Sequence, residues 1–178
     1  MPVFAICGPS GAGKDTLIAA AALCLPALHV VRRTITRPAE AGGEPFEPVT
    51  EAEFAARAGQ GAFALHWQAH GLRYGIPIAA LRAAEAGQVV VLNASRRMLP
   101  QAMAVFPGLT VIEITAPPKV LAQRLAARGR ESAEDIARRL ARAAPLPEGL
   151  RVLRIDNGGA LAPAVDALVA ALQPMAAR

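Results

Sequence analysis

The residues with the clearest chemical meaning form a glycine-rich segment near the start of the chain. Residues 8–16 read Gly-Pro-Ser-Gly-Ala-Gly-Lys-Asp-Thr, after an apolar run at 3–7 and before a helical pattern that begins at Leu17. Glycines let successive backbone N–H groups curl around a phosphate, and a helix N-terminus adds partial positive charge. This order of strand, loop, lysine and helix predicts a phosphate-binding loop. Its predicted nucleotide contacts are Gly8, Pro9, Ser10, Gly11, Ala12, Gly13, Lys14, Asp15 and Thr16.

The lysine of this loop is unusual for the composition of the chain. Of 19 lysines and arginines, only Lys14 and Lys119 are lysines. A compact ammonium on a thin stem fits between phosphates where a planar guanidinium does not. We therefore predict that Lys14 is a catalytic residue that contacts the outer phosphates of a nucleotide.

Asp15 occupies the position at which such loops usually carry a Ser or Thr that binds magnesium. A carboxylate is a stronger ligand than a hydroxyl for a hard cation such as Mg²⁺. We predict that Asp15 is a metal ligand. The alternative is that Asp15 only complements the dipole of the helix that follows.

Composition and charge narrow the classes of function. The chain has 178 residues, 53% of them apolar, which predicts one folded domain. The net charge is +5, but aromatic residues make up only 4% and the arginines are dispersed, so we expect no nucleic-acid partner. No apolar run reaches the roughly 18 residues of a membrane span, and no signal peptide is expected. We predict a soluble cytoplasmic protein with two buried free thiols, Cys7 and Cys24.

Short apolar runs alternate with longer segments of helical period. The runs at 3–7, 29–31, 89–92, 111–114 and 152–155 predict buried strands. This alternation predicts an α/β fold with a parallel sheet and helices on both faces. Residues 34–77 are rich in Gly, Pro and aromatics and predict an acceptor-binding lobe inserted into a core of 1–33 and 78–178. Within the lobe, Thr50 to Glu53 form a capping-box pattern that starts a helix through Arg57.

A second unusual segment covers about 128–142. Arginines recur there on helical faces, and Gly129 stands between two of them. We predict a lid that closes over phosphates. The alternative is a solvated arginine-rich surface.

The order of these motifs resembles the guanylate kinase family across nearly the whole chain. The resemblance rests on the phosphate-binding loop, Thr36-Arg37-Pro38, Gly43-Glu44, Tyr74-Gly75 and the segment from Arg124 to Leu140. It implies a P-loop fold of the nucleoside-monophosphate-kinase type. It also implies that Arg37 and Tyr74 bind an acceptor phosphate, that Arg128 and Arg139 are lid arginines, and that Asn157 lies near the adenine.

The chain departs from that family at two positions. Leu65 stands where a guanylate kinase has an acid that reads guanine, and Leu65 cannot accept hydrogen bonds from a base. Asn93 stands where the family has a magnesium-directing Asp, and we infer that Asp15 compensates for that lost carboxylate.

Further residues resemble one branch, the ribose 1,5-bisphosphate phosphokinases: Ile35-Thr36-Arg37, Arg57 to Gln60, Phe63 to Trp67 and Gly71 to Gly75. This resemblance implies transfer of the ATP γ-phosphoryl group to ribose 1,5-bisphosphate in phosphonate utilisation, with ATP and Mg²⁺ as cofactors. The alternatives are a nucleoside monophosphate kinase and an inactive binding module; a homodimer stays open. The predicted catalytic residues are Lys14, Arg37, Arg128 and Arg139, and the predicted substrate-binding residues are Arg33, Arg37, His66, Arg73, Tyr74 and Arg96.

Overall fold

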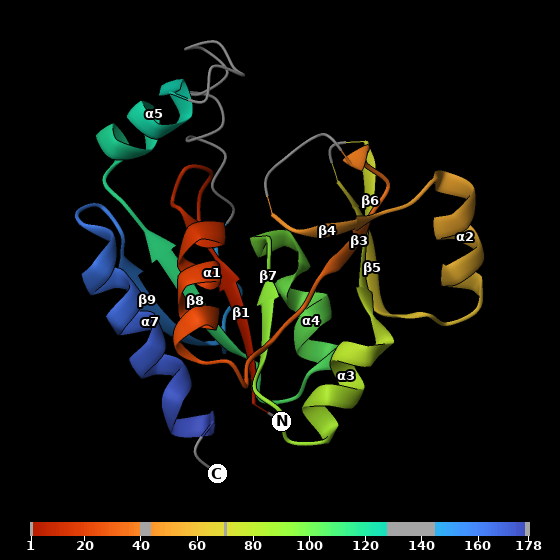
Figure 1. Ribbon diagram of the computed structural model, residues 1–178. Helices are drawn as coiled ribbons and strands as arrows, with labels where there is room; N and C mark the ends of the chain where they lie inside the picture. Colours follow the sequence, from red (N-terminus) through yellow and green to blue (C-terminus); the bar gives the residue numbers. More distant parts are fainter. Residues whose placement is uncertain (1, 40–43, 70, 128–144, 177–178) are drawn as a thin grey trace.

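The computed structural model describes residues 2–39, 44–69, 71–127 and 145–176. A five-stranded sheet with the order β2-β7-β1-β8-β9 forms its centre, and every neighbouring pair in it is parallel (Figure 1). The predicted parallel α/β architecture is therefore confirmed. The elements of this part are β1 (Val3–Cys7), α1 (Lys14–Cys24), β2 (His29–Val30), α3 (Ile78–Glu85), β7 (Val90–Asn93), a 3₁₀ helix (Arg96–Met98), α4 (Leu99–Val105), β8 (Thr110–Thr115), α5 (Pro118–Ala127), β9 (Arg151–Asp156) and α7 (Leu161–Ala176).

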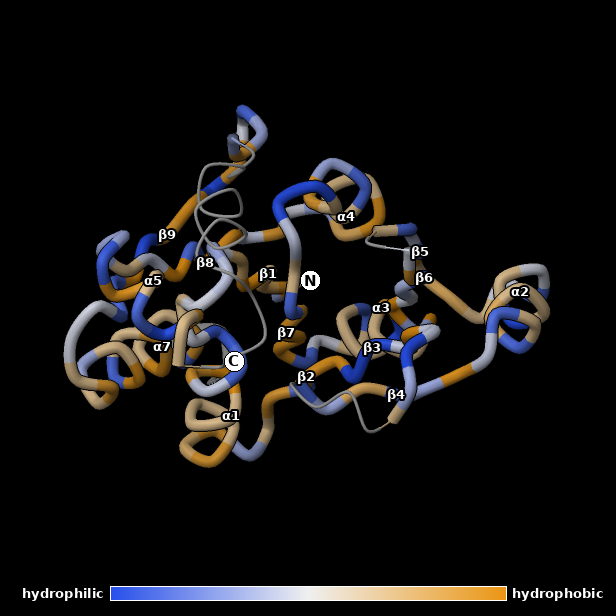
Figure 2. The backbone as a smooth tube through the Cα atoms, turned by 90° about the horizontal axis from the view of Figure 1, so that it is seen from above, coloured by the Kyte–Doolittle hydropathy of each residue, from blue (hydrophilic) through white to orange (hydrophobic). Residues whose placement is uncertain are grey.

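The strands of this sheet are apolar on both sides because helices cover both faces. In β1, Ala5 and Cys7 pack into one core cluster, whereas Phe4 and Ile6 pack into the other. The first cluster is covered by α3 and α4, and the second by α1 and α7. Figure 2 shows the apolar central strands between these helices. This two-sided burial is the reason that the strands read as continuous apolar runs in the sequence.

A second sheet of four strands lies beside the first, with the order β4-β3-β6-β5. Helix α2 covers its outer face (Figure 1). Thr50 caps α2 in a complete capping box with Glu53, as the sequence predicts. The elements of this part are β3 (Arg33–Ile35), β4 (Phe46–Pro48), α2 (Glu51–Gly59), β5 (Phe63–Ala69) and β6 (Leu72–Pro77).

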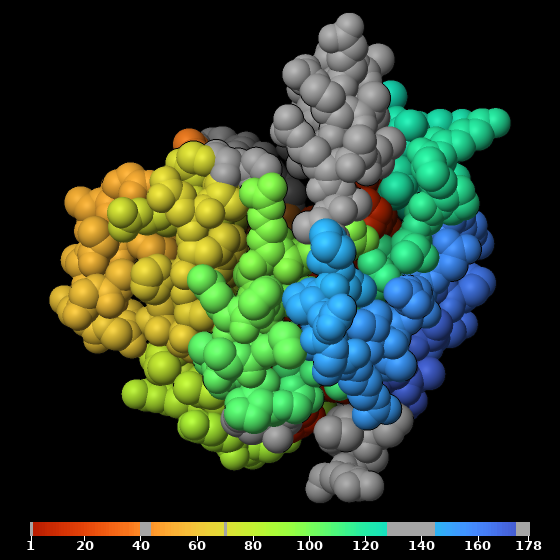
Figure 3. All heavy atoms as spheres, turned by 180° about the vertical axis from the view of Figure 1, so that it is seen from behind, coloured from red at the N-terminus to blue at the C-terminus, as the bar shows by residue number. Residues whose placement is uncertain are grey.

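The two sheets share one hydrophobic core. Leu65 of β5 and Ile76 of β6 belong to the same buried cluster as Val90 and Leu92 of β7 and Phe106 after α4. Seen from behind, the green segment of α4 lies between the second sheet and the C-terminal elements (Figure 3). The second sheet thus packs against α3 and α4, the helices that cover this face of the central sheet.

Two properties of the surface bear on the expectations above. Within the described ranges, no helix combines the length and the apolar character needed to cross a membrane. Cys7 is buried, but Cys24 is exposed at the end of α1, so the expectation of a second buried thiol is wrong. Cys24 ends its helix on the solvent side, where a thiol is as compatible with the fold as any small residue.

Candidate active site

The phosphate-binding loop connects the carboxyl end of β1 to the start of α1. Gly8 has φ +150°, and a Cβ atom there would lie 2.2 Å from the carbonyl oxygen of Ile114. Gly13 is the left-handed N-cap of α1, with φ +86° and no side chain that caps the helix. The N–H groups in the first turn of α1 are therefore not satisfied by a cap and can bind an anion.

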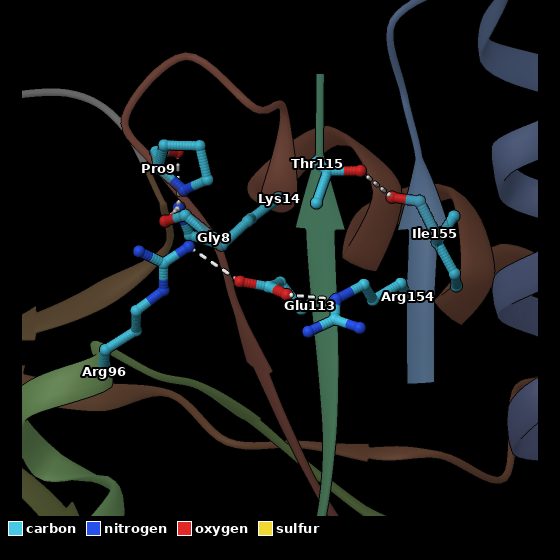
Figure 4. A network of polar contacts seen from close by, with 8 residues as sticks. All are labelled: Gly8, Pro9, Lys14, Arg96, Glu113, Thr115, Arg154 and Ile155. Atoms are coloured by element: carbon cyan, nitrogen blue, oxygen red, sulfur yellow. Dashed lines mark hydrogen bonds and ion pairs between the residues drawn. The ribbon is translucent and has the colours of Figure 1, made fainter. Parts of the chain in front are cut away.

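Lys14 lies folded over the loop. Its Nζ donates hydrogen bonds to the carbonyl oxygens of Gly8, at 3.0 Å, and Pro9, at 3.3 Å (Figure 4). Burial lowers the pKa of Lys14 below its ordinary value, and the charge of Asp15 opposes this effect. A phosphate in the loop would supply the stronger anionic partner that this buried ammonium requires.

Asp15, which replaces the usual Ser or Thr of the phosphate-binding loop, is in direct contact with Asn93, which replaces the magnesium-directing Asp of guanylate kinases. The Asn93 Nδ2 donates to Asp15 Oδ1 at 2.6 Å and to Glu44 Oε2 at 2.9 Å. Asn93 ends β7, so this contact joins the central sheet to α1 and to the segment before β4. Oxygen atoms of two carboxylates thus accept hydrogen bonds from one amide nitrogen.

Arg33 is the first residue of β3. Its side chain lies on the inner face of the second sheet, which is the face opposite α2. This side chain forms an ion pair with Glu44, and its guanidinium lies 5.2 Å from the ring centre of Tyr74 and 5.9 Å from that of Trp67. Trp67 and Tyr74 stack at 5.2 Å with 9° between their planes. The Arg33 side chain is only 12% exposed, and its Nε has no hydrogen-bond partner within the described part of the chain.

Arg37 follows β3 and lies on the same inner face. Its guanidinium is 4.2 Å from the ring centre of Phe46, at van der Waals distance of a cation–π contact. Arg37 also lines an open cavity of about 410 Å³, together with Thr36, Pro38, the segment from Pro48 to Thr50 and the carboxylates Glu51 and Glu53 at the start of α2. The sheet thus presents two arginines, Arg33 and Arg37, on one side.

His66 and Arg73 lie on the opposite face of the second sheet. Trp67 is paired with Tyr74, and Gln68 with Arg73, so alternation along the strands sends Arg73 away from Tyr74. Both His66 and Arg73 contact Phe54 of α2. Arg73 also forms an ion pair with Glu51 at 3.2 Å. The structure therefore separates these two residues from Arg33, Arg37 and Tyr74.

Leu65 lies in the shared core rather than at a ligand site. It is 6% exposed and packs with Ile76 and the residues of β7. A side chain buried in this way does not contact an acceptor. The resemblance to guanylate kinases puts Leu65 where an acid reads guanine, but in this structure its side chain lies in the core.

Two arginines approach the loop from other elements. Arg96, in the 3₁₀ helix after β7, is bonded to Glu113 of β8 at 2.7 Å. Arg124 of α5 donates to the carbonyl oxygen of Gly11 at 3.4 Å. No motif assigns a chemical role to Arg124 or Glu113, although a single carboxylate within the apolar run of β8 is an unusual feature that marks Glu113.

Asn157 reaches the loop from the segment after β9. Its Nδ2 donates to the carbonyl oxygen of Ala12 at 2.7 Å. Asn157 is 3% exposed, and in the described part of the chain its Oδ1 accepts no hydrogen bond. A buried acceptor without a partner is costly, so this oxygen is suited to a donor on a ligand.

The remaining predicted residues divide into two groups. Ser10 and Thr16 lie in the loop and in the first turn of α1, as their motif requires. Arg128, Arg139 and the whole predicted lid of about 128–142 lie outside the described residues.

Comparison with known proteins gives close relatives by sequence. A ribose 1,5-bisphosphate phosphokinase PhnN of Ruegeria sp. is 53% identical over 174 residues, covering 97% of this chain and 92% of the relative. The protein of the same name from Agrobacterium fabrum is 48% identical, covering 98% of this chain and 97% of the relative. A scan against models of protein families finds no match.

Solved structures resemble the fold at low sequence identity. A guanylate kinase from Anaplasma phagocytophilum superposes with a TM-score of 0.70 and 17% identity, covering 98% of this chain and 87% of that one. A gluconokinase from Sinorhizobium meliloti gives a TM-score of 0.56 and 18% identity, covering 98% of this chain and 93% of that one. The fold is therefore that of the P-loop kinases. Identity of about one half over nearly the full length decides the family: the chain belongs to the ribose 1,5-bisphosphate phosphokinases.

Proposed function

We propose that the protein transfers the γ-phosphoryl group of ATP to the 1-phosphate of ribose 1,5-bisphosphate, giving 5-phospho-α-D-ribose 1-diphosphate and ADP. The names of the relatives supply the substrate. The geometry supports the reaction class, because a phosphate-binding loop with a buried lysine faces a sheet that carries two arginines on its inner side. We further propose that it acts in phosphonate utilisation, in the cytoplasm, where ATP is available.

The donor side of the proposed site is the loop itself. The N–H groups of residues 10–16 would bind the β- and γ-phosphates, and Lys14 would exchange its bonds to Gly8 and Pro9 for bonds to phosphate oxygens. Asn157 would offer its free Oδ1 to the exocyclic amino group of adenine. The lid arginines Arg128 and Arg139 would add positive charge to the transferring group.

The acceptor side is proposed on the inner face of the second sheet. Arg33, Arg37 and Tyr74 would hold the phosphates of the sugar, because guanidinium groups bind phosphate oxygens in pairs. Arg33 already has a fixed orientation through Glu44 and the rings of Tyr74 and Trp67. Arg96 would contact the acceptor phosphate from the end of β7. His66 and Arg73 would act on this site only indirectly, since α2 covers the face on which they lie.

Magnesium fits the oxygen atoms near Asn93. Asp15 would be the protein ligand, with the Asn93 amide and Glu44 close by. When bound, the ion would neutralise charge on the donor phosphates. The hydrogen bond from Asn93 holds the Asp15 carboxylate toward the carboxyl end of β7.

The chemistry needs little beyond alignment and charge. Phosphoryl transfer passes through a loose transition state, so cations that surround both phosphates lower the barrier. The acceptor is a phosphate whose second pKa is about 6, so it is largely ionised at neutral pH. A general base is therefore not required, and the proposed work of the protein is to hold two anions in line.

ADP release by the purified protein tests this function. We would supply ATP and magnesium with ribose 1,5-bisphosphate, with GMP, or with no acceptor, and run a Lys14→Ala variant alongside. We expect turnover with the sugar bisphosphate alone, lost in the variant. Turnover with GMP instead would reveal a nucleoside monophosphate kinase, and no turnover with either would contradict kinase activity.

A further inference from the structure

Glu113 is a carboxylate within the interior of the central sheet. It lies on β8 between Ile112 and Ile114, which are fully buried, and its own side chain is only 8% exposed. A buried charge destabilises a fold strongly unless it is paired. The chain therefore retains a costly group at this position, and its partners indicate what the group does.

Both oxygens of Glu113 bind arginines (Figure 4). Oε1 accepts from Arg96 Nη2 at 2.7 Å, and Oε2 accepts from Arg154 Nε at 2.9 Å. The two arginines differ in their surroundings, because the Arg96 side chain is 17% exposed and that of Arg154 is 71% exposed. An ion pair with an exposed partner contributes little to stability. The bond to Arg96 is therefore the stronger constraint of the two.

The path of the Arg96 side chain explains where this bond holds the guanidinium. Strand β1 lies between β7 and β8 in the sheet. Arg96 follows β7, so it must cross the carboxyl end of β1 to reach β8. At that end Cys7 is paired with Glu113, and Gly8 then opens the phosphate-binding loop. Figure 4 shows Arg96 reaching toward Glu113 on the side where Gly8 and Lys14 lie.

This position lies on the acceptor side of the loop. Met98, which ends the same 3₁₀ helix, packs in the core cluster that also holds Leu65 of the second sheet. Helix α1 covers the other face. Crevices beside a central strand of this kind, at the carboxyl edge of a parallel sheet, are where ligands bind in open α/β folds.

We propose that Glu113 is a positioning residue for phosphoryl transfer, holding the Arg96 guanidinium across the start of the phosphate-binding loop, where it meets the acceptor phosphate. The inference rests on the proposed function for the identity of that acceptor. A free arginine side chain loses rotamer freedom when it binds phosphate. The bond to Glu113 removes most of that freedom before the substrate arrives. Arg154 balances the charge of the carboxylate from the solvent side.

A double-mutant cycle separates this role from mere stabilisation. We expect Glu113→Gln to raise the KM for ribose 1,5-bisphosphate about tenfold, with the KM for ATP nearly unchanged. Arg96→Gln should give a similar loss, and Glu113→Gln should add nothing in that background. The matched control is Arg154→Gln, which breaks the exposed bond and should leave both constants unchanged. Equal losses in Glu113→Gln with and without Arg96 would overturn the proposal.

A measurement without turnover keeps this inference distinct from the proposed reaction. The NMR signal of the Arg96 Nη2–H₂ group, assigned by its absence in Arg96→Lys, should be sharp in the unmodified protein and in Arg154→Gln. It should broaden or disappear in Glu113→Gln. A signal that stays sharp would overturn the positioning role, whatever the acceptor proves to be. If Glu113→Gln does not fold, Glu113→Asp, which shortens the reach by one methylene, should show the same broadening.

Discussion

Asn93 and Asp15 are joined by a hydrogen bond of 2.6 Å, from the amide at the end of β7 to the carboxylate in the first turn of α1. Each of these residues departs from the pattern of guanylate kinases, and they are 78 positions apart in the chain. Because the two residues are in contact, both departures alter the same place in the structure. The amide nitrogen of Asn93 can orient the neighbouring carboxylate without competing with it for a cation, because an amide NH₂ group is a hydrogen-bond donor only.

Removal of the Asp15 carboxylate should weaken the use of magnesium. We expect Asp15→Asn to raise the magnesium concentration needed for half-maximal activity by about tenfold, because a neutral amide is a poorer ligand for a hard cation. Titration of activity with magnesium at saturating ATP measures this. The control is Asp166→Asn on the exposed side of α7. An unchanged magnesium requirement in Asp15→Asn would leave Asp15 only a role at the helix dipole.

Loss of the donor group of Asn157 should loosen the phosphate-binding loop. Asn157→Asp keeps the size of the side chain but cannot donate to the buried Ala12 carbonyl. We expect the free energy of unfolding to fall by about 1–3 kcal/mol, as measured by urea denaturation. Gly159→Ala serves as control, since a Cβ there meets nothing within 4 Å. Equal stability of the two variants would show that this bond does not matter.

The affinity for ATP should depend on pH through Lys14. Burial lowers the pKa of Lys14 from 10.5 in the nucleotide-free protein, and phosphates would raise it again. Below the lowered pKa the ammonium is charged before and after binding. Between the lowered pKa and the higher pKa of the complex, binding must take up a proton, so affinity falls by up to about tenfold per pH unit. Calorimetry in buffers of different ionisation enthalpy detects that proton, and Lys14→Met should abolish its uptake.

Stability in acid should depend on Glu47 in the second sheet. Hydrogen bonds from Arg57, and to a smaller extent from Thr34, hold the pKa of Glu47 below its ordinary 4.5. Since the folded pKa is the lower one, this stabilisation is complete above 4.5 and is lost as the pH falls through the folded value. Glu47→Gln should therefore lower the stability at neutral pH slightly and flatten its decline in acid. Urea unfolding at a series of pH values tests this; parallel curves would speak against the pairing.

The strands of the central sheet could be predicted from the sequence because a buried strand appears as a run of consecutive apolar residues. The inner strands β7, β1 and β8 are buried on both faces, so each appears as an apolar run, and Thr50 with Glu53 marked the start of α2. The faces of the second sheet were harder to predict. A register shift between Phe63 and Leu65 changes which residues of β5 point inward. His66 and Leu65 therefore lie in surroundings that alternation, read from sequence alone, does not determine.

Contacts between distant segments were the other part that the sequence could not supply. Nothing in the spacing of Arg33, Trp67 and Tyr74 indicates that the cation lies over two stacked rings. The same holds for Arg96 and Glu113, which meet only because β1 lies between β7 and β8. The sequence gives residue types at the ends of strands, but the order of the strands decides which of them become neighbours.

The core shared by the two sheets limits how the protein can be recombined. Leu65 and Ile76 fill space between strands and helices that belong to the central sheet. A chimera that received the four-stranded sheet of another kinase would have to match the shapes of Val90, Leu92 and Phe106 as well as the two points of chain crossing. The four-stranded sheet therefore cannot be exchanged as an independent unit in order to change the acceptor. Single substitutions on the inner face of the second sheet are a more direct way to change the substrate.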